Sequence, residues 1–124
     1  MLDNIIQRLR SGKVLIDDGC ALNILFAGAL TELGLRKKDL TPVNSPLWRI
    51  VLGRASQPLG EITLPVEFGT IDNFCTEYVN FLVADFDKAY HAILGRPALT
   101  KFMAMPHYSY LVLKMPAPRG VLSL

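Results

Sequence analysis

The sequence predicts a mostly β domain with several short strands and two short helices, arranged as a closed or sandwich-like unit. Three observations support this. Apolar and polar residues alternate over 61–68, a second strand-like run rich in Tyr, Val and Phe covers 75–84, and short aliphatic runs elsewhere end at a glycine. Successive side chains of a strand point to opposite faces, so strict alternation indicates a half-buried strand.

Length and composition narrow the class of protein. A chain of 124 residues that is 51% hydrophobic and 19% charged forms one domain with more apolar surface than a small fold usually hides. This favours self-association or a piece of a longer chain. A net charge of +2 does not indicate nucleic-acid binding. The longest mostly apolar run, 21–30, is about half the length of a membrane span, so no membrane partner is expected.

Cysteine usage points to a reducing, cytoplasmic compartment. The chain has two cysteines, Cys20 and Cys75, too few for a metal site or a disulfide framework. We therefore expect no metal site.

The first half of the chain is predicted from local signals. Residues 1–12 fit either an amphipathic helix or a strand-like arm, and 14–16 read as a short buried strand. Asn23 can cap a helix over 23–33 that stops at Gly34. A loop over 35–46, a strand from Trp48 to Leu52 and a turn over 53–56 complete this half.

The second half contains the clearest periodicity. Strands 61–68 and 75–84 form a long hairpin, in which Pro65 makes the first an edge strand or introduces a bulge. A short strand over 93–95 precedes a helix over 96–102, because Pro97 suits the first helical turn. A last strand is expected over 108–115. The expected division is an arm at 1–12, a domain at 13–115 and a tail or linker at 116–124.

The stretch 14–25 is the centre of the functional argument. A strand of three aliphatic residues runs directly into Asp17 and Asp18, and Gly19 then allows a turn. Ionisable oxygen at the tip of a buried strand is costly unless it is solvated, hydrogen-bonded or used in chemistry. The residues alone leave open that Asp17 only caps the following turn.

A second unit has the same outline, because Ile93-Leu94-Gly95-Arg96 also joins a hydrophobic strand to a helix. Together the two units resemble the retropepsin family of aspartic proteases, and more closely the protease segment of plant gypsy-type LTR retrotransposon polyproteins. The matching stretches are 14–26, 57–66, 81–83 and 90–99.

The resemblance implies a retropepsin-like small closed β-barrel and an aspartic endopeptidase that acts as a homodimer on a polypeptide, its own polyprotein. Such an enzyme would need no metal and no cofactor. Asp17 would be catalytic, with the two Asp17 carboxylates facing each other across a two-fold axis. The active-site loop would also contain Asp18, Gly19 and Cys20. The flap that covers the substrate would contain Ile50, Val51, Leu52 and Gly53. The supporting motif would be Ile93, Leu94, Gly95 and Arg96.

Several residues differ from the family pattern. Asp18 replaces a hydroxyl residue that braces the two loops of a dimer, so its carboxylate must be protonated, turned outward or solvated. Cys20 is expected to pack as a small apolar group. His91 and His107 are interpreted as structural, and Trp48 as a core or interface residue.

Two alternatives to an active protease remain open. One is an inactive retropepsin-like module that dimerises or binds peptides, or a decayed element fragment. The other is an unrelated small β interaction domain.

Overall fold

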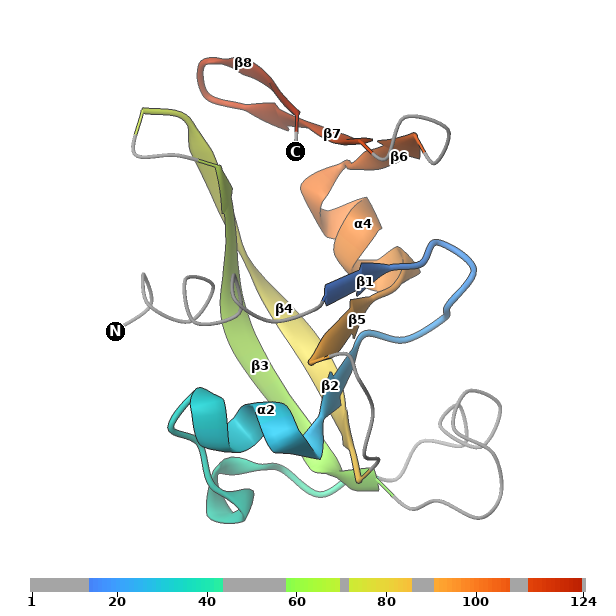
Figure 1. Ribbon diagram of the computed structural model, residues 1–124, viewed down its shortest axis with the longest axis vertical. Coiled ribbons are helices and arrows are strands. Elements are labelled where there is room, and N and C mark those ends of the chain that lie inside the picture. Colours follow the sequence, from blue (N-terminus) through green and yellow to red (C-terminus); the bar gives the residue numbers. More distant parts are fainter. Residues whose placement is uncertain (1–13, 44–57, 70–71, 86–90, 108–111, 124) are drawn as a thin grey trace.

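A computed structural model of the chain describes residues 14–43, 58–69, 72–85, 91–107 and 112–123. These residues form two β-sheets, two short α-helices and one 3-10 turn (Figure 1). The predicted mostly β class with two short helices is confirmed. No helix of the described part is both long and apolar enough to cross a membrane.

The larger sheet has five strands in the order β1-β5-β2-β4-β3. Their bounds are Val14–Ile16 for β1, Ala92–Leu94 for β5, Ile24–Phe26 for β2, Phe74–Ala84 for β4 and Pro58–Gly69 for β3. The β1–β5 and β2–β4 pairs are parallel, whereas β5–β2 and β4–β3 are antiparallel. Because β1 and β5 are parallel, their carboxyl ends meet at one edge of the sheet.

The predicted helix over 23–33 is wrong in its first turn. Ile24–Phe26 is strand β2, and helix α2 covers only Ala27–Glu32. All three β2 residues are buried, because β2 lies between β4 and β5 at the centre of the sheet. Backbone pairing with both neighbours outweighs the local helical signal. The predicted end of the helix is correct: Gly34 has a positive φ of 72°, and Leu35 N–H donates to Leu30 O at 2.8 Å, as in a Schellman motif.

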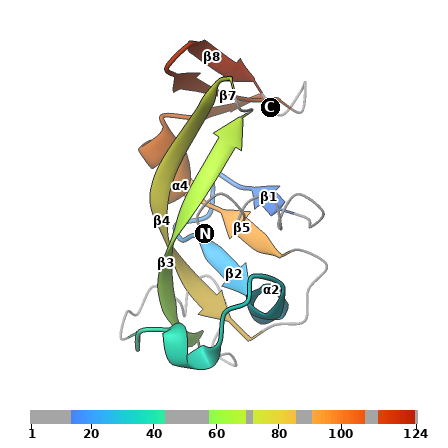
Figure 2. The same ribbon diagram turned by 90° about the vertical axis from the view of Figure 1, so that its left-hand side faces the viewer.

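The predicted long hairpin is confirmed as β3 and β4, which cross the molecule side by side (Figures 1 and 2). Strand β3 lies at the edge of the described sheet. The backbone N–H and C=O of Glu61 face outward, where both bond Thr41 at 2.8 Å. Backbone groups of successive residues in a strand point to alternate sides, so those of Pro65, like those of Glu61, point away from β4. Proline has no N–H, and at this position β4 needs no donor from β3.

Helix α4 covers Arg96–Phe102, as predicted, and a 3-10 turn, Lys37–Asp39, lies within the stretch expected to be a loop. The main core lies between the hairpin and the helices. Its buried members include Leu25, Ala29, Leu30, Leu64, Val66, Val79, Phe81, Val83, Leu99 and Phe102. The rings of Phe68 and Phe102 meet edge to face with centroids 4.9 Å apart, an arrangement that aromatic pairs favour.

The smaller sheet contains β6 (Met105–His107), β7 (Val112–Ala117) and β8 (Gly120–Ser123) in that order. The last strand was predicted over 108–115, but β7 continues to Ala117 and pairs with β8. Residues 116–123, which were expected to form a tail or linker, lie in this β7–β8 hairpin. In the sequence, the Pro118-Arg119-Gly120 stretch between two runs that contain Val and Leu is the signal that indicates this hairpin.

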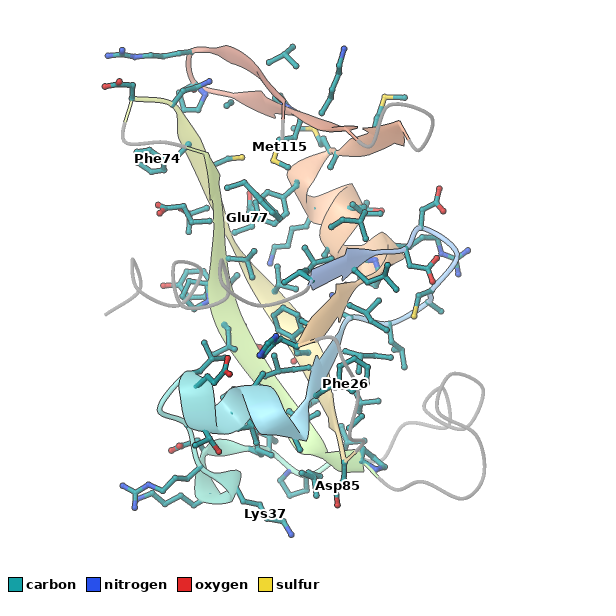
Figure 3. All side chains as sticks on the ribbon, viewed as in Figure 1. Phe26, Lys37, Phe74, Glu77, Asp85 and Met115 are labelled. Carbon is teal, nitrogen blue, oxygen red and sulfur yellow. The ribbon has the colours of Figure 1, made fainter. Side chains whose placement is uncertain are left out.

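Two contacts attach this sheet to the β3–β4 hairpin. Met115, which is labelled in Figure 3, is 1% exposed. Its Sδ lies 3.1 Å from Cys75 Sγ. Arg119 N–H also donates to Asn73 Oδ1 at 3.0 Å. Burial raises the pKa of the Cys75 thiol, and Glu77 and Glu67 raise it further. The thiol therefore stays protonated and can donate to the methionine sulfur.

Candidate active site

The loop after β1 carries Asp17 and lies against the turn after β5. Asp17 N–H donates to Leu94 O at 3.0 Å, and Arg96 N–H donates to Cys20 O at 2.9 Å. The parallel pairing of β1 with β5 brings these segments together (Figure 1). Two backbone hydrogen bonds thus fix the loop to residues 94–96.

Asp17 is partly buried at the start of a tight turn. Its Oδ1 accepts the Gly19 N–H at 3.0 Å, and its backbone oxygen accepts the Cys20 N–H at 3.2 Å. Asp17 therefore caps the turn that follows it, which is the alternative that the residues alone left open. The turn fixes one carboxylate oxygen at the tip of β1.

Gly95 is required by the close approach of the two segments. A Cβ at this position would lie 2.2 Å from Leu22 O and 2.7 Å from Cys20 O. Both atoms are backbone, so no side chain could turn away to make room. The loop can therefore lie on the turn only where residue 95 has no side chain.

The other predicted loop residues differ in their surroundings. Asp18 and Gly19 are exposed. Asp18 borders a shallow depression with Arg96, Leu99, Thr100, Met103, Ala104 and Met105. In the single chain the Asp18 carboxylate therefore lies at the surface, near an arginine that lines the same depression. Cys20 packs against the small cluster of Ile24, Phe26 and Ala84, as expected for a small apolar group.

The predicted supporting residues lie beside this loop. Ile93 and Leu94 belong to β5, Gly95 precedes α4, and Arg96 is exposed at the first position of α4. The predicted flap at Ile50, Val51, Leu52 and Gly53, together with Trp48 and the arm at 1–12, lies outside the described residues.

The two histidines were interpreted as structural. His91 Nε2 lies 2.9 Å from Glu32 Oε2, which connects the residue before β5 to the end of α2. His107 belongs to β6. In the described part of the chain, no group of three or more His, Cys, Asp or Glu side chains could hold a metal ion.

Asn23 is the residue of this region whose role the sequence did not reveal. It was expected to cap the helix that follows it, but α2 begins later and has no side-chain cap. Asn23 Oδ1 instead accepts the backbone N–H groups of Gly95 and Ala98 at 3.0 and 3.2 Å. The residue type signalled a cap, but no local pattern shows that the capped helix is α4.

Comparison with known proteins shows the fold. The chain is similar to the crystal structure of the retroviral protease-like domain of Ddi1 from Leishmania major, with a TM-score of 0.58 and 18% sequence identity. The match covers 91% of this chain and 83% of that domain. This chain has a retropepsin-like fold. No family model matches the sequence, and no curated protein sequence matches it.

Asp17 has a defined place in this retropepsin-like fold. The chain has an Asp-x-Gly sequence in the loop after its first described strand. Asp17 lies at the end of that strand, and the loop lies against a glycine turn from a parallel neighbour.

Proposed function

We propose that this chain is one subunit of a homodimeric aspartic endopeptidase, in which Asp17 supplies the catalytic carboxylate. The observation that carries the proposal is the position of Asp17 in a retropepsin-like fold. It stands at the tip of β1, partly exposed, in a turn held by the Leu94 carbonyl. No lysine or arginine in the described part of the chain forms an ion pair with it.

The chemistry explains why a second subunit is needed. Two carboxylates placed close together cannot both be ionised, so the pair shares one proton. The ionised member takes a proton from a water molecule that attacks the peptide carbonyl. The protonated member donates a hydrogen bond to the carbonyl oxygen. One chain supplies a single Asp17, so it holds half of such a site.

The depression beside Asp18 supports this form of association. It contains an acidic residue, Asp18, a basic residue, Arg96, and two well-exposed methionines. Met103 and Met105 are 69% and 66% exposed. A two-fold interface uses the same patch on both subunits, so the patch must complement itself. A surface with both charge signs and exposed apolar side chains meets that requirement.

The substrate that we propose is a polypeptide, namely the polyprotein from which the chain itself derives, as in plant gypsy-type retrotransposons. The support is the resemblance of segments 14–26 and 90–99 to those elements. A domain of this kind would release itself and its neighbours by cleaving the segments between them.

The second candidate is a retropepsin-like module that dimerises without cleaving peptides. Asp18 favours it, because a hydroxyl residue at this position braces the loops of the active family members. In a dimer, two Asp18 carboxylates would add negative charge close to the Asp17 pair and oppose its assembly at neutral pH.

Cleavage of peptides by the purified protein at about pH 5 tests the first proposal, because a shared-proton pair works under mildly acidic conditions. Asp17→Asn keeps the size of the side chain but cannot share the proton. We expect it to lower the cleavage rate by about a hundred- to ten-thousandfold with an unchanged circular dichroism spectrum. Absence of cleavage by the wild type, or an unaffected Asp17→Asn variant, would contradict the proposal.

Asp18→Thr distinguishes the two candidates. It removes the additional carboxylate and introduces a hydroxyl, so we expect a tighter dimer at pH 7.5 and a higher cleavage rate. Sedimentation equilibrium at pH 7.5 measures the first effect. A dimer constant equal to that of the wild type would remove the main support for an inactive module.

A further inference from the structure

We infer that Asn23 is a positioning residue for Asp17 and acts through the turn at residues 94–96. The side chain of Asn23 connects that turn to helix α4 and to strand β4. The catalytic part of this inference rests on the proposed function, whereas its structural part does not.

Asn23 is 5% exposed and is the one buried polar side chain among the described residues. Its amide makes three hydrogen bonds. Oδ1 accepts Gly95 N–H at 3.0 Å and Ala98 N–H at 3.2 Å, and Nδ2 donates to Asn80 O at 3.1 Å. A buried amide that satisfies backbone groups of two other elements at once restricts how those elements can move relative to each other.

The two N–H groups that Asn23 binds lie at the start of α4. Gly95 is the residue before the helix and Ala98 is in its first turn, where N–H groups have no partner within a helix. A cap normally comes from the residue immediately before the helix. Gly95 cannot provide one, because a side chain there would collide with Leu22 O and Cys20 O. The loop that contains Cys20 and Leu22 therefore requires glycine at position 95. The residue that follows this loop, Asn23, supplies the side-chain cap of α4 that position 95 cannot provide.

The same turn holds Asp17. Leu94 O accepts Asp17 N–H, and Arg96 N–H donates to Cys20 O. Gly95, which lies between these two anchors, is bound by Asn23. Loss of the Asn23 amide would free the middle of the turn and, with it, the carbonyl that fixes the backbone of Asp17. In this way Asn23 acts on Asp17 without touching it.

Amide hydrogen exchange tests the inference without using activity. In Asn23→Ala, the exchange of Gly95, Ala98 and Asp17 amides should accelerate by roughly tenfold or more, beyond the change in global opening measured on the buried strand β4. Asn73→Ala is the matched control. Asn73 also accepts one backbone N–H, from Arg119, but in the C-terminal sheet. It should leave the three amides unchanged.

Asn23→Asp keeps the test valid if the alanine variant does not fold. Its carboxylate retains the two acceptor bonds but, when ionised, cannot donate to Asn80 O. We expect Gly95, Ala98 and Asp17 to stay protected in this variant. Equal protection of Asp17 in wild type and Asn23→Ala would overturn the inference, as would an Asn23→Asp variant that loses all three protections.

Peptide cleavage separates a positioning role from a merely structural one. Per folded molecule, Asn23→Ala should lower kcat by about tenfold with little change in KM, because the geometry of Asp17 changes more than the surface that binds substrate. An unchanged kcat alongside accelerated Asp17 exchange would overturn the positioning role. If the wild type cleaves nothing, the proposed function fails, and the exchange of the Asp17 amide alone decides whether Asn23 holds this loop.

Discussion

The segments 14–32 and 92–102 begin alike and continue differently. Each opens with a three-residue strand, and the two strands pair in parallel. After Leu94 the chain passes Gly95 and enters a helix at once. After Ile16 it makes a seven-residue loop through Asp17 and Asn23, then forms a second strand, β2, before its helix starts at Ala27.

The extra strand explains the difference. β2 pairs with both β5 and β4, so it joins the short strands β1 and β5 to the long hairpin. The second segment has no such strand, and its helix starts where the first segment makes the aspartate loop. As a result the first segment supplies the candidate catalytic residue, and the second supplies the glycine turn on which that residue rests.

The largest effect on stability is expected at the centre of β2. Leu25 is fully buried, so Leu25→Ala should lower the free energy of unfolding by about 2–5 kcal/mol. Leu22→Ala, the same change in the partly buried loop three residues earlier, should cost less than half as much. Urea denaturation compares the two. Equal losses would mean that 24–26 is no more central to the core than the loop.

A smaller effect is expected from alanine at the glycines of the two segments. Gly95→Ala would force its Cβ against two backbone oxygens, and we expect a loss of about 1–3 kcal/mol. Gly28→Ala in α2 is the matched control, because nothing lies within 4 Å of a Cβ there. It should raise stability by up to about 1 kcal/mol. Thermal unfolding that shows the same sign for both would contradict the close approach at Gly95.

The smallest effect concerns the pair formed by Glu32, at the end of the first segment, and His91, immediately before the second. Glu32→Gln removes the partner of His91, but the Glu32 side chain is 50% exposed, so the loss should stay below about 1 kcal/mol. Added salt should reduce this loss, as urea denaturation at low and high salt would measure. A loss that salt does not change would show that the pair contributes through packing alone.

Features with short-range causes could be predicted from the sequence. The alternation of 61–68 predicted β3, and the run over 75–84 predicted its partner β4. Pro65 predicted an edge strand or a bulge, Gly34 predicted the end of α2, and Pro97 predicted α4. Each depends on the geometry of a few consecutive residues. The aspartate turn at Asp17 and Gly19 is of the same kind. That it belongs to a retropepsin-like fold was inferred from resemblance, and the comparison of structures supports that fold.

Contacts between distant residues were decided by the tertiary structure. Ile24–Phe26 became a strand because two neighbours offered it backbone pairs on both sides. The helix that Asn23 caps starts more than 70 residues later in the chain, since the contact between Asn23 and Gly95 spans 72 positions. The local sequence shows that an amide can form hydrogen bonds and that a glycine allows another segment to approach closely. Only the packing of β1 beside β5 decides which atoms receive those contacts, because that packing joins parts of the chain that have no local interaction.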